Sequence, residues 1–248
     1  MTDKSRELTP AEIKANVAKA NAEATAALAE AEKNSAEARK FGYEADRAFQ
    51  AFTADSIGLE QVQHLRKREL ACDSYHHVYQ FMGKVAEASV ASCVRELSFW
   101  NRDCPKCDIE FIINSPGGEV IAGMAMYDYL MYLRTQGHKI TTVAIGYAAS
   151  MAGILLQAGD VRVMGREAYV LIHEVSFGAG GKIGEVEDEV AFVRKIQDRV
   201  LHIFSKRSLA AQPKTGLTVK QFENKWKRRD WWLDSDEALK IGVVDEIR

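Results

Sequence analysis

The stretch NSPGGEV, Asn114 to Val120, marks the point where a strand gives way to a helix. The preceding segment, DIEFIINS, is apolar and predicts a buried strand. The following segment, EVIAGMAMYDYLMYLRTQG, has the apolar face of a helix and ends at Gly137. The proline turns the chain, and the two glycines permit positive φ angles and the close approach of a ligand to the backbone. A plain strand-to-helix turn also explains such a run, so this stretch alone leaves the function open.

Strand-like and helix-like segments alternate from about Tyr75 to the C-terminus. Further strands are predicted by YHHVYQFMG, KITTVAIG, DVRVMG and AYVLIHEV, and further helices by AEASVASCVRELSFW, EVEDEVAFVRKIQDRVLHIFSKR and TVKQFENKWK. A glycine-rich loop from Gly178 to Gly184 precedes the longest of these helices. Alternation of this kind predicts the α/β fold class.

Residues 1–70 have a different character. Twelve of the thirty residues from Ala11 to Lys40 are alanine, and large apolar residues are few. TPAE, Thr9 to Glu12, predicts a capping box with proline at the first helical position. A second, more amphipathic stretch follows, but no heptad seam of leucine or isoleucine predicts a coiled coil. We therefore predict a solvated helical extension over 1–70, with a docking arm as the alternative, and a separate domain over 71–248.

The composition of the chain limits the kinds of partner that it is expected to bind and the cell compartment in which it is expected to act. The formal charge of −2 argues against nucleic-acid binding. The sequence has no run of 18 apolar residues that would predict a membrane helix, and its polar start does not resemble a secretory signal. Four cysteines are too sparse for a disulfide scaffold. These features predict a cytoplasmic protein that acts neither on nucleic acid nor in a membrane.

The pair CPKC, Cys104 to Cys107, has the spacing of a metal-binding or redox motif. A structural zinc site needs four ligands, and the sequence has no second CxxC or HxxxH pair. A thioredoxin-like role needs a strand before the motif and a helix after it, whereas here a helix precedes and a strand follows. We therefore predict two loop thiols, no metal site and no cofactor.

The stretch GYAASMAG, Gly146 to Gly153, places Ser150 between a strand and a short helix. Ser150 is either the cap of that helix or a nucleophile whose oxyanion the N–H of Met151 would face. It does not lie in a G-x-S-x-G elbow, because Ala148 occupies the position of the first glycine. His173 ends an apolar strand and is either a half-buried structural histidine or the base for a nearby serine.

Together these segments resemble the proteolytic subunit of the Clp protease (ClpP). INSPGGEVIAGMAMYD is similar to the glycine turn and helix of that family, GYAASM to its nucleophile segment, and LIHEV to its base segment. RDWWLDSDEALKIGVVDEI aligns without a gap with its acid segment. The resemblance covers about Tyr75 to Arg248. It implies the spiral of stacked β-β-α units that this family shares with the crotonases.

The resemblance also implies a serine endopeptidase with the triad Ser150, His173 and Asp230. In such a triad the serine attacks the scissile carbonyl, the histidine transfers its proton, and the aspartate orients the imidazole. The N–H groups of Gly118 and Met151 would form the oxyanion hole. A substrate strand would lie between two segments. Their residues are Gly117, Glu119, Val120, Glu174, Val175 and Ser176.

Partners follow from the same resemblance. It implies polypeptide substrates, a homo-oligomer of stacked rings joined by a glycine-rich strand and a long helix after His173, and a AAA+ unfoldase. Glu174-Val175 replaces the Gln-Pro of the family, which leaves peptide specificity open, and the extension over 1–70 leaves unfoldase docking open. This divergence leads to the hypothesis of a phage or mobile-element origin. The alternatives are a catalytically silent ring or scaffold subunit and a crotonase-fold acyl-CoA enzyme.

Overall fold

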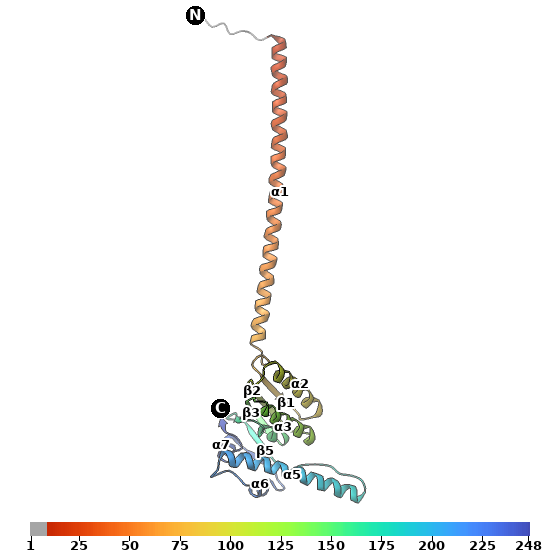
Figure 1. The fold of residues 1–248 in the computed structure, drawn as a ribbon, viewed down its shortest axis with the longest axis vertical. Coiled ribbons are helices and arrows are strands. Elements are labelled where there is room, and N and C mark those ends of the chain that lie inside the picture. The colour runs from red at the N-terminus through yellow and green to blue at the C-terminus, as the bar shows by residue number, and fades with distance from the viewer. Residues whose placement is uncertain (1–8) are drawn as a thin grey trace. The chain divides into compact units, whose positions relative to one another are not determined.

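A computed structural model describes residues 9–248, and the chain in it divides into two units, Met1–Arg68 and Glu69–Arg248 (Figure 1). The boundary lies close to the one expected at residue 70, and the assignment of a separate domain to each side stays a prediction.

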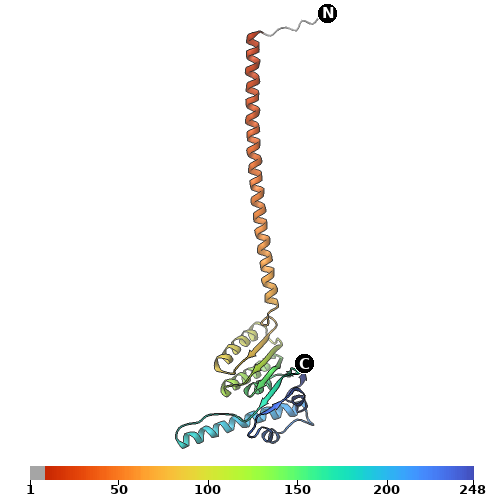
Figure 2. The same ribbon diagram turned by 180° about the vertical axis from the view of Figure 1, so that it is seen from behind.

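The main element of the first unit is α1, Pro10–Leu70, a single helix of 61 residues whose last two residues lie past the boundary at Arg68. Figures 1 and 2 draw it as one continuous ribbon. The predicted capping box is present, because the Thr9 N–H donates to Glu12 Oε2 at 2.8 Å and the Glu12 N–H donates to Thr9 Oγ1 at 3.3 Å. The helix continues without a break through the more amphipathic second stretch, since alanine has the highest helix propensity and no proline interrupts it after Pro10. No residue of α1 is buried.

The second unit is built on a seven-stranded sheet. Its strands are β1 Val78–Met82, β2 Ile109–Ser115, β3 Ile140–Ala149, β4 Val161–Met164, β5 Tyr169–Ile172, β6 Trp231–Leu233 and β7 Glu246–Ile247. The order is β1-β2-β3-β4-β7, and β5 pairs with β3 and with β6. Every pairing is parallel except that of β5 with β6. A mostly parallel sheet with intervening helices confirms the predicted α/β class.

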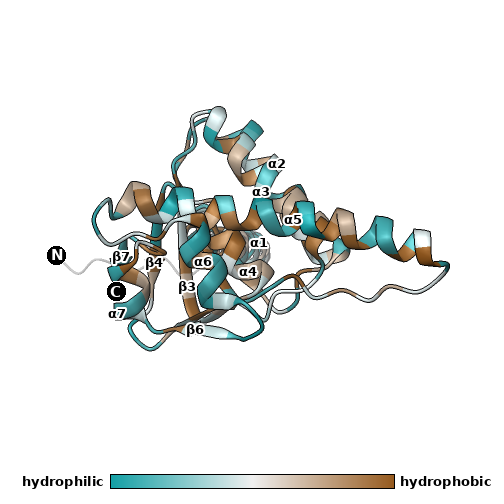
Figure 3. Ribbon diagram, turned by 90° about the horizontal axis from the view of Figure 1, so that it is seen from below, coloured by the Kyte–Doolittle hydropathy of each residue, from teal (hydrophilic) through white to brown (hydrophobic). Residues whose placement is uncertain are grey.

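Six helices of this unit follow the predicted pattern. They are α2 Glu87–Asp103, α3 Val120–Thr135, α4 Met151–Leu156, α5 Ile183–Ala211, α6 Val219–Trp226 and α7 Ser235–Lys240. The expected cap of α6 is present, because Thr218 Oγ1 accepts from the Gln221 N–H. Apolar and polar residues alternate along α5, as Figure 3 shows. Within residues 9–248, no helix combines the length and apolarity needed to cross a bilayer.

One local expectation was wrong. The first strand begins at Val78 rather than Tyr75, because hydrogen-bonded turns occupy the preceding residues and His77 has a φ of 55°. The glycine-rich segment is a loop in the single chain, as its composition predicted. The strand that the resemblance implies there joins two rings, so it stays a prediction. Gly184 already belongs to the first turn of α5.

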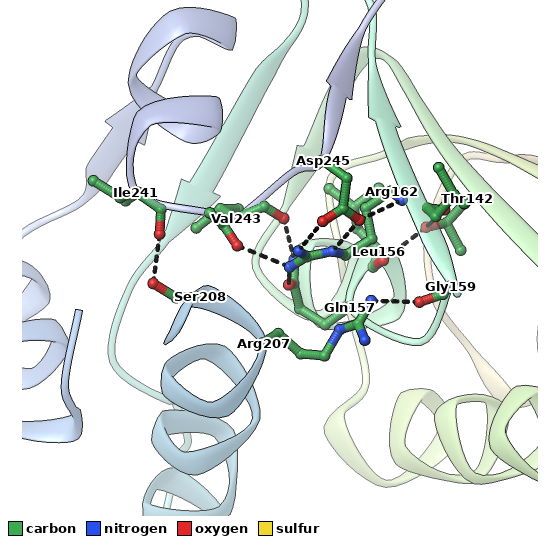
Figure 4. A network of polar contacts seen from close by, with 12 residues as sticks. Thr142, Leu156, Gln157, Gly159, Arg162, Arg207, Ser208, Ile241, Val243 and Asp245 are labelled. Carbon is green, nitrogen blue, oxygen red and sulfur yellow. Dashed lines mark hydrogen bonds and ion pairs between the residues drawn. The ribbon is translucent and has the colours of Figure 1, made fainter. Parts of the chain in front are cut away.

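A buried arginine joins β4 to the C-terminal segment (Figure 4). The side chain of Arg162 is 1% exposed and donates to both carboxylate oxygens of Asp245, at 2.9 and 2.6 Å. It also donates to Gln157 Oε1 at 2.7 Å and to the carbonyl oxygen of Gly242 at 2.9 Å. Burial raises the pKa of Asp245, but the hydrogen bonds and charge of Arg162 outweigh burial, and the pKa lies below its usual value. The pair therefore stabilises the fold when Asp245 is ionised.

We expect Asp245→Asn to lower the free energy of unfolding by about 3 kcal/mol, because it leaves a buried guanidinium without its counter-charge. The folded-state pKa of Asp245 is depressed, so its contribution is present above the unfolded pKa and is lost as pH falls through the folded pKa. Urea midpoints should therefore differ most between wild type and variant at neutral pH and converge in acid. Asp236→Asn, which breaks an exposed pair with Arg166, is the control. Equal midpoints at neutral pH would contradict this role.

Candidate active site

Ser150 occupies a strained turn between β3 and α4. Its φ of 56° and ψ of −122° lie outside the ordinary range of a residue with a side chain. The Ser150 N–H donates to the Leu171 carbonyl oxygen at 2.9 Å, and the Ser150 carbonyl oxygen accepts from the Gly153 N–H at 3.0 Å. Although Ser150 stands at the N-cap of α4, its hydroxyl makes no capping hydrogen bond. Such a conformation costs roughly 1–3 kcal/mol and persists where the surroundings impose it.

The glycine turn lies directly against this serine. Gly117 and Gly118 have φ values of 84° and 150°. A Cβ on Gly117 would lie 2.5 Å from the Ala149 carbonyl oxygen and 2.9 Å from the Met151 nitrogen, and a Cβ on Gly118 would overlap the Val85 carbonyl oxygen. The absence of side chains therefore allows the turn to approach the backbone on either side of Ser150.

The N–H groups of this turn differ in what they bind. The Gly117 N–H donates to Ser115 Oγ at 3.1 Å, and the Glu119 N–H donates to the Val85 carbonyl oxygen at 2.8 Å. Between them, the Gly118 N–H has no acceptor within residues 9–248. Met151 is the first residue of α4, where helical N–H groups lack an intrahelical partner. Both donors border the same pocket and remain open to an oxyanion.

His173 reaches this pocket through the pairing of β5 with β3. Ala149 is in register with Leu171, so Ser150 lies beside Ile172, the residue before His173. Ser150 and His173 line one pocket with Gly118 and Met151. The half-buried ring of His173 is held by its Nδ1, which lies 2.5 Å from the Glu174 carbonyl oxygen.

The remainder of the pocket is largely apolar. Four of the six residues predicted to bind substrate line it, namely Val120, Glu174, Val175 and Ser176. Of the other two, Gly117 packs behind Ser150 and Glu119 is exposed. Sequence reasoning missed several lining residues, which are Ile154, Ile172, Val200, Phe204 and Trp226. Their only signal was their place on apolar helix and strand faces, which core residues share.

Asp230 approaches His173 from the other side of β5. The antiparallel register pairs Ile172 with Trp231, so extending it by one residue sets Asp230 opposite His173. Facing residues of this kind have Cβ atoms about 4.5–5.5 Å apart. Both residues border a second, shallow pocket with Glu174, and Glu174 Oε2 accepts from the Arg228 N–H at 3.0 Å, which anchors the loop before Asp230.

The aspartate is nevertheless not bonded to the histidine. Asp230 is exposed, and among residues 9–248 no hydrogen bond or ion pair joins it to His173, whose Nδ1 is occupied by the Glu174 carbonyl oxygen. The structure therefore brings Ser150 and His173 to one pocket and Asp230 to its edge.

Comparison with known proteins identifies the family of the chain. The model of the family described as Clp protease matches residues 72–248. The chain belongs to the Clp protease family. α1 lies outside the matched residues.

Two relatives within the Clp protease family illustrate the degree of similarity. The chain is 32% identical over 170 residues to an ATP-dependent Clp protease proteolytic subunit of Deinococcus radiodurans, covering 67% of this chain and 78% of the relative. It is 38% identical over 150 residues to ATP-dependent Clp protease proteolytic subunit 2 of Tropheryma whipplei, covering 60% of this chain and 77% of the relative.

We expect Gly117→Ala to destabilise the domain by about 1–3 kcal/mol, because the new methyl group must displace backbone atoms around Ser150. Gly178→Ala is the matched control, since a Cβ there meets nothing within 4 Å. Thermal unfolding followed by circular dichroism should give a lowered Tm for the first variant only. Equal melting of both variants would show that the glycine turn does not pack against the serine as described.

Proposed function

We propose that this protein is a serine endopeptidase that hydrolyses peptide bonds of unfolded polypeptides. The observation that carries the proposal is the uncapped hydroxyl of Ser150, which is held at a positive φ in one pocket with His173. A serine that only capped α4 would use its oxygen to accept from an N–H of the first turn. Strain retained at a polar side chain in a pocket is typical of a reacting group.

The tautomer of His173 supports a role as general base. Its Nδ1 faces a carbonyl oxygen, so this nitrogen carries the proton and donates to Glu174. Nε2 then has a free lone pair, which is what a base needs to accept the proton of Ser150 Oγ. In the proposed reaction Ser150 Oγ attacks the scissile carbonyl carbon, His173 takes the proton, and the imidazolium returns it to the leaving amine. Water then hydrolyses the acyl-enzyme by the same transfers in reverse.

Asp230 completes the proposed triad by replacing the Glu174 carbonyl oxygen as the partner of Nδ1. The β5–β6 register, extended by one residue, supports this role because it would set Asp230 opposite His173. A carboxylate is the stronger partner, because it stabilises the imidazolium that forms when Ser150 loses its proton. The N–H groups of Gly118 and Met151 form the proposed oxyanion hole, where loss of one donor costs roughly 100–1000-fold in rate.

The pocket favours an extended peptide with an apolar side chain. A substrate strand lies, in this proposal, between the backbone at 117–120 and that at 174–176, with main-chain hydrogen bonds to both. Apolar side chains of α4, α5 and α6 line the pocket beside Ser150. Desolvation of an apolar residue there provides binding free energy without a specific polar contact.

Assembly into stacked rings is part of the proposal. The apolar stripe of α5, at spacings of three and four, includes half-buried Val186, Val190 and Val193. Ile183 and Phe192 on the same helix are 79% and 52% exposed. Apolar surface of this extent on one helix is typical of an interface. The two relatives are named as subunits of ATP-dependent proteases, so an ATP-driven unfoldase is the proposed partner, acting in the cytoplasm.

We expect Ser150→Ala to lower hydrolysis of unstructured peptides by at least ~10⁴-fold, because the base cannot act without its nucleophile. Ser56→Ala, which changes a half-buried serine of α1 that does not line the pocket of Ser150, should leave the rate unchanged. A fluorophosphonate should label the wild type at Ser150, as located by mass spectrometry of the digested protein. A wild-type chain that neither hydrolyses peptides nor reacts with the probe would instead indicate a silent subunit or an acyl-CoA enzyme.

A further inference from the structure

Three side chains of types that can bind a metal ion lie close together, outside the candidate active site. They are His77, just before β1, Cys104, at the end of α2, and Cys107, just before β2. Their ligand atoms all lie within 4.8 Å of one another. We propose that His77, Cys104 and Cys107 bind a zinc ion. This site is independent of the proposed peptidase activity, since none of the three residues lines the pocket of Ser150.

The end of α2 presents the two thiols. The Cys104 N–H donates to the Trp100 carbonyl oxygen at 2.8 Å and ends the helix. The turn then closes with the Cys107 N–H donating to the Cys104 carbonyl oxygen at 3.2 Å, and Lys106 inside it has a φ of 66°. A closed C-x-x-C turn directs two cysteines toward one point, as in structural zinc sites.

The sheet brings the histidine to the same point. The His77 carbonyl oxygen accepts from the Glu110 N–H at 3.0 Å, directly before the β1–β2 ladder begins. The His77 ring packs edge-on against Trp100, with 5.5 Å between ring centroids. The start of β1 and the turn after α2 are therefore fixed on the same tryptophan and on the same strand, β2.

Zinc fits this set of donors. Two thiolates and one imidazole, with water in the fourth position, form a tetrahedral set that zinc accepts. With Zn–S near 2.3 Å and Zn–N near 2.0 Å, ligand atoms of such a site lie about 3.3–3.8 Å apart. Side-chain movements of roughly 1 Å would close the cluster around the ion, and all three residues are half-buried, so solvent has limited access.

His138 supports the site without being a ligand. It is 3% exposed, its Nδ1 lies 2.9 Å from the Cys107 carbonyl oxygen, and its Nε2 lies 2.8 Å from Asn101 Oδ1. Both ring nitrogens are therefore occupied, although Nδ1 lies only 3.6 Å from Cys107 Sγ. Outer partners of this kind fix the orientation of the residues that bind a metal.

Binding is a simple exchange of protons for metal. One Zn²⁺ displaces the protons of two thiols and forms two Zn–S bonds and one Zn–N bond, and no oxidant or reductant takes part. The ion would link the start of β1, at the edge of the sheet, to the end of α2. It would thereby stabilise the first strand against fraying.

The test uses the full chain, reduced and stripped of metal with a chelator. Zn²⁺ is then titrated against a chromogenic competitor, and Co²⁺ is added separately as a spectroscopic probe. We expect one metal ion per chain, thiolate-to-cobalt charge-transfer absorption, and a Tm that rises with Zn²⁺, because the ion binds only the folded state. The cobalt spectrum needs no variant, so it tests the site even where a substitution impairs folding.

Matched variants locate the ligands. His77→Gln and Cys104→Ser should weaken zinc binding at least ~100-fold, beyond what loss of an outer partner costs. The neighbouring substitutions His76→Gln and Cys72→Ser, at exposed residues outside the cluster, should bind as wild type does. Absence of cobalt–thiolate absorption in the reduced wild type would overturn the proposal. So would unchanged binding in the cluster variants, or isolation of the chain with Cys104 and Cys107 joined as a stable disulfide.

Discussion

The pairing of β5 with two neighbours at once is the constraint on which the candidate site depends. On one side, the parallel ladder with β3 brings the turn at Ser150 to His173, and the Ser150 N–H to the Leu171 carbonyl oxygen. On the other side, the antiparallel ladder with β6 sets Asp230 opposite His173. A slip of one residue in either ladder would turn the side chains to the opposite face. Strand pairing thus brings segments that are far apart in the chain to the end of β5.

The parts of the candidate site lie together at the carboxyl ends of parallel strands. β2 ends in the glycine turn, β3 ends at Ser150, and β5 ends at His173. In open α/β sheets ligands bind at these ends, because loops and helix N-termini gather there. The positive φ of Ser150 is tolerated because Gly117, which has no side chain, leaves room for the adjacent backbone. A side chain added at Gly117 would therefore force the turn at Ser150 to change its conformation.

Much of the fold could be predicted from short-range patterns. Apolar runs and helical spacing located the strands β1 to β5 and the long helices but not β6. The Thr9 and Thr218 caps were confirmed, because such features depend on residues within a few positions of each other. The start of β1 was misplaced, since apolar and aromatic residues before it lie in turns. The glycine-rich segment is a loop, because a strand there would need a partner outside the chain.

Only those residues of the candidate site that lie in recognisable sequence motifs could be predicted. Resemblance named Ser150, His173 and Asp230, but the contact of Glu174 with the loop at Arg228 joins residues far apart in sequence, as does the approach of His77 to the CPKC turn. The spacing of residues in a sequence cannot predict such contacts, because they depend on which strands pair and in which register. A zinc motif is recognised in a sequence from cysteines and histidines at fixed spacings. Such a motif around CPKC does not include His77, which lies before α2.

We propose that the register of β5 and β6 brings Asp230 to His173 when the site reacts. The decisive measurement is a crystal structure of the assembled protein with Ser150 covalently phosphonylated. We expect an Asp230 carboxylate oxygen within about 2.6–3.2 Å of His173 Nδ1 and a phosphonyl oxygen facing the N–H groups of Gly118 and Met151. An adduct in which Nδ1 still donates to the Glu174 carbonyl oxygen, with Asp230 turned to solvent, would contradict it.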